Sequence, residues 1–225
     1  MIETSTRSKV MYKVGGISLV IVGISYIVGA VLSLIIGPAP SDALDYLNAL
    51  SAHRLLSMTN FAFFTLADVF IVPAAITLYI TLKDTNKPAM LTASTLMIVF
   101  AVFDAGITEL NSFQLVALSQ NLAAATSEAQ RSAIMLTVNS IQSTLPIITL
   151  CSFVISSIGL AITAAVMVKG AFSKRATLPG LTAGVAGTLG GFYIIVPILS
   201  VLMVPSIIAM GIWGIFAGRA IQKMK

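Results

Sequence analysis

The sequence predicts an all-α fold, a polytopic transmembrane bundle of six helices in one membrane domain that covers residues 1–225. Hydrophobic residues make up 57% of the chain and charged residues 9%, whereas soluble domains contain roughly 45–50% apolar residues. The mean hydropathy is +1.00, and the apolar residues fall into blocks of about 20, the length of a membrane-crossing helix. We expect spans at residues 14–37, 60–82, 88–110, 145–168, 179–198 and 201–220, with outer segments at 38–59 and 111–144.

The first apolar run, about Val14 to Gly37, follows a basic start. It resembles the opening of a signal peptide, but such peptides contain only about 7–15 apolar residues, so we predict a retained first span. The segment Pro38-Ala39-Pro40 then breaks the helix, and Ser41 is the candidate N-cap of the next one. Leucines recur on one face after it, which predicts a short amphipathic helix at the membrane surface: Leu44, Leu47 and Leu50.

The second and third spans are predicted to form an antiparallel pair. The second runs from about Asn60 to Leu82 and ends in the compact polar turn Lys83–Pro88. The third starts at Pro88, a residue suited to a first helical turn, and its helical pattern continues beyond Leu110. We expect Thr126 or Ser127 to cap the following helix, with Glu128 well placed in its first turn. The third and fourth helices are therefore expected to extend past the bilayer as a hairpin, here called the outer hairpin, residues Leu110 to Gln142.

The fourth span is expected to end at Lys169, before the basic residues Lys174 and Arg175. About 42 mostly apolar residues then precede Arg219, enough for two spans of about 20 residues each. The segment from Pro197 to Pro205 is the predicted turn between them.

The distribution of basic residues predicts the orientation of this arrangement. With six spans, eleven Lys and Arg residues share one side and only Arg54 and Arg131 lie on the other. By the positive-inside rule both termini are cytoplasmic, in a multi-pass protein of the plasma membrane. Because the basic residues lie at span ends, the net charge of +5 does not indicate nucleic-acid binding. The eleven residues are Arg7, Lys9, Lys13, Lys83, Lys87, Lys169, Lys174, Arg175, Arg219, Lys223 and Lys225.

Small residues recur at helical spacing in four spans, where they allow helices to approach closely in lipid. The pattern fits contacts within one chain, and it equally allows an interface between two copies. The fifth-span stripe is Gly180, Gly184, Gly187 and Gly191, and the sixth-span stripe is Gly211, Gly214 and Gly218. The first span carries Ser25, Gly29 and Ser33, and the fourth carries Thr149, Ser152 and Ser156.

Two acids, Asp68 and Asp104, lie deep within apolar runs, where an ionisable side chain is costly and marks a candidate functional site. Counted back from the turn between their spans, both lie at a helix rise of about 21–22 Å. They are therefore predicted to be level and nearer the outer face than the midplane. If they face each other, the two carboxyls would share one proton at neutral pH.

The candidate site can be interpreted in two ways. One is a proton or cation site open to the outer side, with Glu109 as an entry residue. The other is purely structural, in which each acid forms hydrogen bonds to polar groups of neighbouring spans and orients the bundle. The candidate partners are Thr149, Ser152 and Asn139.

The sequence offers little support for catalysis. His53 is the single histidine and lies outside the spans, so a Ser–His site within the membrane is excluded. His53 with Asp42 and Asp45 makes at most a weak surface metal group. We expect no catalytic residue, no metal site and no cofactor.

The layout resembles domain of unknown function 4386, a family of six-span prokaryotic membrane proteins. The resemblance rests on the segment from Ala52-His53-Arg54-Leu55-Leu56, the span ending in Leu78-Tyr79-Ile80-Thr81-Leu82-Lys83, and the glycine-rich final spans. The third span of that family often carries an Arg followed by a Glu, whereas residues 101–105 of this chain contain Asp104 and no Arg. The resemblance implies a membrane domain without an established activity, and it transfers no residue roles.

Two functions remain open on this evidence. The first is a non-enzymatic structural or partner-binding subunit of the bilayer, which contacts a partner protein or a second copy through the outer hairpin or the glycine stripes. The alternative is a small transporter or a proton- or cation-binding membrane protein that uses Asp68 and Asp104.

Overall fold

The computed structural model describes residues 2–170 and 172–224, with side chains from residue 9 onward. Within this part of the chain the secondary structure is helical, without strands. Arg7 and Lys225, which belong to the predicted basic side, have side chains outside the described residues. The helices are α1 (Ile2–Ile36), α2 (Ala43–Ala52), α3 (Arg54–Phe103), η1 (Asp104–Glu109), α4 (Leu110–Ala124), α5 (Glu128–Lys169), α6 (Lys174–Gly191), η2 (Phe192–Ile194), η3 (Pro197–Leu202) and α7 (Met203–Gln222).

Four helical stretches of the described chain are long and apolar enough to cross a membrane: Lys9–Ile36, Arg54–Ala124, Glu128–Lys169 and Pro197–Gln222. The bundle also exposes apolar side chains along its length, and Val69, Val102 and Ile147 are each more than half exposed. A surface of this kind suits contact with lipid, because soluble proteins rarely expose large contiguous apolar patches. The chain is therefore an α-helical membrane protein with at least four membrane-crossing helices by length and composition.

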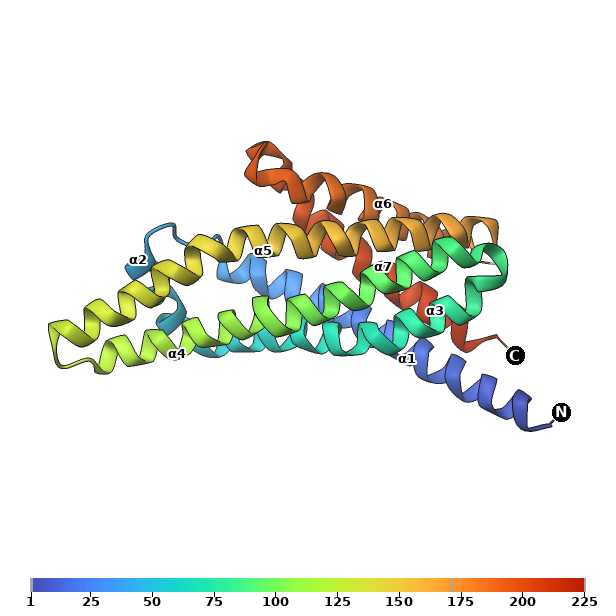
Figure 1. Ribbon diagram of the computed structural model, residues 1–225, viewed down its shortest axis with the longest axis horizontal. Coiled ribbons are helices and arrows are strands. Elements are labelled where there is room, and N and C mark those ends of the chain that lie inside the picture. Colours follow the sequence, from blue (N-terminus) through green and yellow to red (C-terminus); the bar gives the residue numbers. More distant parts are fainter. Residues whose placement is uncertain (1, 171, 225) are drawn as a thin grey trace.

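Helix α3 is two antiparallel limbs joined at Asn86. This residue has non-helical backbone angles, φ −159° and ψ 89°, and its side-chain oxygen accepts a hydrogen bond from the Ala89 N–H at 3.2 Å. The chain reverses direction there, between the cyan and green parts of the ribbon in Figure 1. The predicted polar turn at Lys83–Pro88 is thereby confirmed.

Helix α2 begins one residue later than predicted. Its N-cap is Asp42, not Ser41, because the Asp42 carboxylate accepts hydrogen bonds from the N–H groups of Leu44 and Asp45. The buried face accordingly consists of Ala43, Leu47 and Leu50. Leu44, predicted to share that face, is instead exposed, since it lies about 100° around the helix from Ala43.

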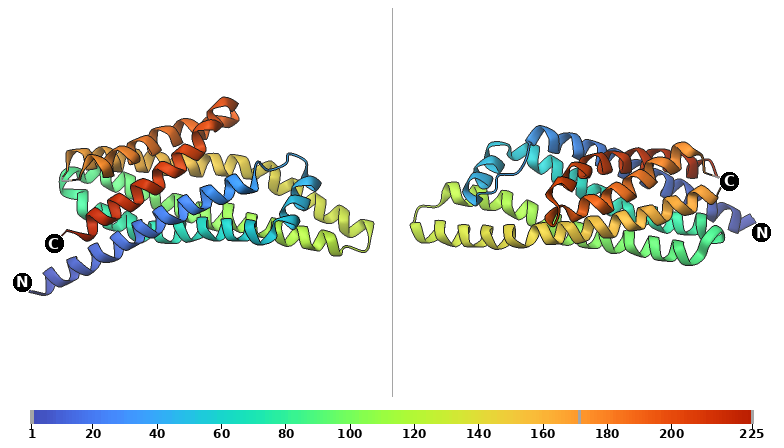
Figure 2. Two further views of the ribbon diagram at one scale, coloured as in Figure 1. Left: turned by 180° about the vertical axis from the view of Figure 1, so that it is seen from behind. Right: turned by 90° about the horizontal axis from the view of Figure 1, so that it is seen from above.

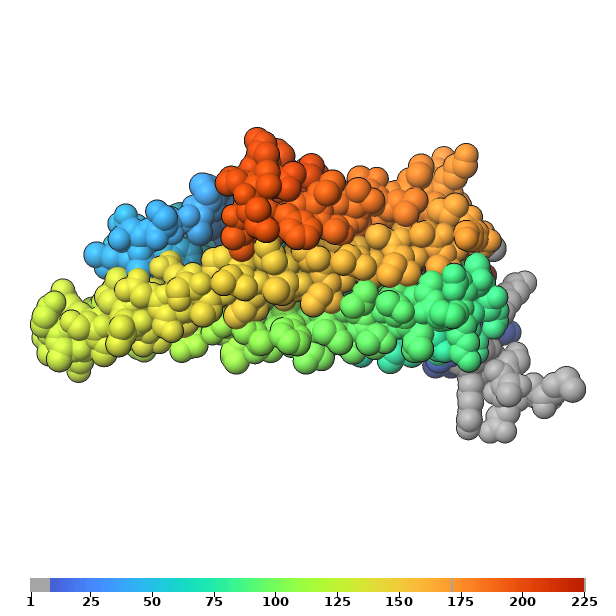
Figure 3. Space-filling model, turned by 45° about the horizontal axis from the view of Figure 1, so that its top comes forward, coloured from blue at the N-terminus to red at the C-terminus, as the bar shows by residue number. Residues whose placement is uncertain are grey.

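The outer hairpin is formed by α4 and the first half of α5. Ser127 caps α5 as predicted, in a reciprocal capping box with Gln130. The hairpin closes on α2 over a small apolar cluster, here called the outer core, and it projects beyond the rest of the molecule (Figures 1 and 3). The outer core contains Ala43, Leu47, Leu50, Leu115, Val116, Val138 and Ile141.

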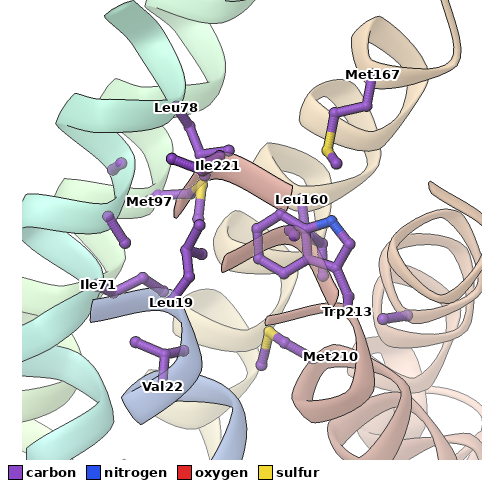
Figure 4. Packing of buried hydrophobic residues seen from close by; sticks show 14 of the residues in the cluster. Leu19, Val22, Ile71, Leu78, Met97, Leu160, Met167, Met210, Trp213 and Ile221 are labelled. Atoms are coloured by element: carbon purple, nitrogen blue, oxygen red, sulfur yellow. The ribbon is translucent and has the colours of Figure 1, made fainter. Parts of the chain in front are cut away.

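The larger core lies between α1, α3, α5, α6 and α7, and Trp213 of α7 is its largest buried side chain. Figure 4 shows Trp213 with Leu160 and Met210, while Leu19 and Val22 of α1 lie near Ile71 of α3. Both chain ends lie at the end of the bundle opposite the hairpin tip (Figures 1 and 2).

The glycine stripe of α6 lies against α5 and α7. A methyl group built on Gly184 would come within 2.6 Å of Ala161 on α5, and one on Gly180 within 2.6 Å of Trp213 on α7. Gly187 and Gly191 face Ser157 and Val154 of α5 in the same way. Each of these glycines thus allows a close approach to a helix of the same chain.

The stripe of α7 lies against α1. A methyl group on Gly214 would lie 2.8 Å from the carbonyl oxygen of Leu19, and one on Gly218 would lie 2.5 Å from that of Gly16. Gly211 meets Gly23 similarly. Gly16 and Gly23 are therefore the small residues of α1 that meet this stripe. The predicted Ser25–Gly29–Ser33 stripe faces α3 instead, where Asn60 donates hydrogen bonds to the Gly29 carbonyl and the Ser33 hydroxyl.

The connection between α6 and α7 differs from the prediction. Helix α6 starts at Lys174 and ends at Gly191, whereas the predicted fifth span was 179–198. The connection is made of two short 3-10 helices, Phe192–Ile194 and Pro197–Leu202. It therefore begins earlier than the predicted turn from Pro197 to Pro205. Pro205 fits within the first turn of α7 because the N–H that proline lacks would have no helical partner there.

Candidate functional site

The candidate site is built around a short π-helical turn that interrupts the α-helix after Phe103. Residues Asp104–Glu109 form a single π-helical turn between α3 and α4. In an α-helix two residues five positions apart lie about 140° apart around the axis, but the wider π turn pairs residues i and i+5. Asp104 and Glu109 are therefore brought to one side of the helix. Such π turns occur frequently at functional sites.

Both acids line a partly open cavity of about 150 Å³ between the helices, here called the acid cavity. Four helices contribute to its wall: α1, α3 with its π turn, α5 and α7. The wall is mostly aromatic and aliphatic, and its polar groups are two carboxyls and a few hydroxyls. The lining residues are Tyr26, Phe64, Phe100, Asp104, Thr108, Glu109, Thr149, Phe153, Ser156, Met203, Ile207 and Met210.

Asp68 lies close to this cavity, on the first limb of α3. Its side chain is 1% exposed, and neither carboxylate oxygen has a hydrogen-bond partner. The Tyr26 hydroxyl lies beside this carboxyl, but the two do not form a hydrogen bond of good geometry. Asp104 and Glu109 lie within electrostatic range of Asp68. The three acids predicted from the sequence thus lie in the same region of the bundle, although only Asp104 and Glu109 line the cavity itself.

Several other polar atoms around the cavity are buried without a partner. They include the Tyr26 hydroxyl, the Thr108 hydroxyl and one oxygen of Glu109, whose side chain is 6% exposed. A buried polar group without a hydrogen bond costs free energy, and a buried unpaired charge costs far more. A proton, a cation or water in the cavity would lower that cost.

The hydrogen-bond partners predicted for the purely structural interpretation are not the groups that lie beside the acids, which are the hydroxyls of Tyr26 at Asp68 and Thr108 at Asp104. Asp68 and Ser152 have no side-chain partner, and Asn139 is exposed in the outer hairpin. Thr149 lines the cavity, but no hydrogen bond links it to an acid.

Sequence reasoning missed the aromatic wall. Tyr26 and Phe64 meet with ring centroids 6.1 Å apart and planes inclined at 54°, and Phe100 and Phe153 complete the wall. The one available signal was a tyrosine in the middle of the first apolar run. Its hydroxyl would need a partner at that depth.

A second cavity of about 340 Å³ adjoins the first towards the hairpin end, here called the entrance cavity. Thr149 lines both cavities. The entrance cavity includes Ala39, Pro40, Ser41, Tyr46, Gln142, Leu145, Pro146 and Tyr193. It therefore lies between the segment after α1, the middle of α5 and the η2 region.

Among the described residues, no three His, Cys, Asp or Glu side chains lie close enough together to hold a metal ion. This applies to the acid cavity as well as to the surface group of His53, Asp42 and Asp45. His53 caps the junction of α2 and α3.

A family model described as a domain of unknown function (DUF4386) matches residues 14–218. No curated protein and no solved structure matches the chain significantly.

Proposed function

The chain belongs to the DUF4386 family, whose function is unknown, and we propose from the site itself that it binds a proton or a cation at Asp68, Asp104 and Glu109. One observation carries this proposal: the Asp68 carboxyl is 1% exposed with both oxygens unpartnered. Asp104 and Glu109 are within electrostatic range of Asp68, and carboxylates that interact through a low-dielectric site repel one another. A bound proton or cation removes that repulsion, which makes binding favourable.

The proposed arrangement in the membrane has six spans, with both termini cytoplasmic and the entrance cavity on the outer side of the plasma membrane. The two limbs of α3 and its continuation supply the second and third spans. Helix α6 has 18 residues, a length of about 27 Å that approaches the thickness of the hydrocarbon core. The basic residues support this orientation, because eleven of thirteen fall on the proposed cytoplasmic side.

Partner binding through the outer hairpin, or a structural role for it, stays a prediction. The inner face of the hairpin packs on α2 of the same chain through the outer core. The acid cavity is the more specific feature, because its unpartnered polar atoms call for an occupant. We therefore favour the proton or cation site over the partner-binding role.

Labelling with diisopropylcarbodiimide tests the proposal, since this apolar reagent adds to protonated carboxyls in apolar surroundings. The purified protein in lipid nanodiscs is treated at neutral pH, and modified peptides are located by mass spectrometry. We expect adducts on Glu109 or Asp104 and none on Asp84, which is exposed in the polar turn. The variant Glu109→Gln should lose its own adduct, while Asp84→Asn should leave labelling unchanged. Labelling confined to exposed acids would contradict the proposal.

A further inference from the structure

We propose that the cation taken by the acid cavity is a small organic ammonium ion, a protonated or methylated amine, and not a metal ion. This inference rests on the proposed function above and specifies its ligand. It follows from three properties of the cavity: the chemistry of its wall, the placement of its acids and its size.

The wall presents four aromatic rings, from Tyr26 of α1, Phe64 and Phe100 of α3, and Phe153 of α5. The tilted Tyr26–Phe64 pair forms a corner, and the other two rings come from separate helical segments. An ammonium group with carbon substituents is attracted to ring faces and gains from burial of its methyl or methylene groups. An aromatic enclosure of this kind recognises alkylated ammonium ions in other binding sites.

The acids supply the charge that such a ligand needs. Asp104 and Glu109 both reach the cavity through the π turn, and the buried Glu109 keeps one oxygen unpartnered. The cavity lining contains no Lys, Arg or His, so an anionic ligand would find no partner. Two carboxyls with one cation between them reduce the repulsion that each would otherwise experience.

A metal ion suits this wall poorly. Ca²⁺ takes about 6–8 oxygen ligands, and Mg²⁺ requires near-ideal octahedral geometry. Within the described chain no group of three acidic, His or Cys side chains converges on one point. Methionine and phenylalanine occupy much of the wall instead, and their carbon atoms contribute nothing to a hard cation's coordination shell.

The dimensions of the cavity also fit a compact organic ion. An apolar cavity of about 150 Å³ is known to hold one benzene molecule, and the acid cavity has about the same volume. Tetramethylammonium has about the bulk of benzene in a rounder shape, so its volume matches that of the cavity. The entrance cavity lies next to the acid cavity, because Thr149 borders both spaces, and two tyrosines, Tyr46 and Tyr193, line it.

Isothermal titration calorimetry on the full chain in nanodiscs tests this inference, with tetramethylammonium as the probe. Tert-butanol serves as a neutral compound of similar shape, and sodium chloride serves as the inorganic competitor. The test variants are Glu109→Gln, Asp104→Asn and Phe153→Leu. The matched controls are Asp84→Asn and Phe216→Leu, which change an acid and an aromatic ring away from the cavity, both exposed.

We expect tetramethylammonium to bind the unmodified chain. Each acid variant should weaken this affinity by about tenfold or more, because removing one partner of a desolvated charge pair is costly. Phe153→Leu should weaken it by about 2- to 30-fold, through the loss of a ring face. The two controls should bind like the unmodified chain, and tert-butanol should bind much more weakly.

Four results would overturn the inference. Equal competition by sodium would indicate an inorganic cation site, and equal binding of tert-butanol would indicate an apolar cavity without charge recognition. If tetramethylammonium does not bind but the carbodiimide still labels Glu109, the organic ligand is rejected and the proposed proton site is kept. Loss of both signals would reject the proposed function as well.

Discussion

The packing of α7 on α1 predicts a large penalty for a single added methyl group at Gly218. A Cβ atom there would lie 2.5 Å from the Gly16 carbonyl oxygen, about 0.9 Å inside an ordinary contact of 3.4 Å. The obstacle is backbone, so it cannot rotate away, and the two helices must separate. Overpacking of this kind costs about 1–3 kcal/mol. In a chain of this length that corresponds to a fall in Tm of roughly 2–12 °C.

The assay is thermal unfolding of Gly218→Ala, followed by size-exclusion chromatography after heating in detergent. Gly106→Ala is the matched control, because a methyl group on Gly106 meets nothing within 4 Å and alanine favours helix more than glycine does. The control should therefore keep or raise the Tm. If Gly218→Ala melts at the same temperature as Gly106→Ala, the close approach of α1 and α7 described above is wrong.

Three further variants test other parts of the structure in the same thermal assay or by hydrogen exchange. Asp68→Asn should leave the Tm unchanged or raise it, because the carboxyl it replaces has no partner; a clear fall would indicate structural hydrogen bonds. Asn60→Leu should lower the free energy of unfolding by about 0.6–1.7 kcal/mol, because the Asn60 amide donates a hydrogen bond to the Gly29 carbonyl at 2.7 Å. An unchanged Tm would contradict that contact. Ser127→Ala should cost about 1 kcal/mol and speed amide exchange at Gln130, whereas unchanged exchange there would show that the cap is dispensable.

Much of the helical layout could be predicted from the sequence because its signals are local. The turn before Pro88, the Ser127 cap and the end of α5 at Lys169 each depend on a few neighbouring residues. The prediction that Asp68 and Asp104 lie at similar depths needs only helix rise. Their proximity to each other also requires a particular rotation of both helices, which side-chain packing sets and which no local pattern encodes.

The features that escaped prediction depend on non-local packing or on a departure from ideal helix geometry. Ideal helical periodicity points Glu109 about 140° away from Asp104, and only the π turn brings both to the cavity. The partners of the α7 stripe, Gly16 and Gly23, were missed because several small residues in the first span have helical spacing. Which of them meets α7 is decided by the whole bundle.

The central claim is that the buried acids hold a proton or a cation, and infrared spectroscopy of the carboxyl groups tests it most directly. A protonated carboxyl has a C=O stretching band that a carboxylate lacks. We predict that the unmodified chain shows this band at neutral pH and that adding tetramethylammonium reduces it. The band should be weaker in Asp68→Asn and Glu109→Gln and unchanged in Asp84→Asn. The absence of any such band at neutral pH, together with no spectral change on adding the cation, would contradict the account.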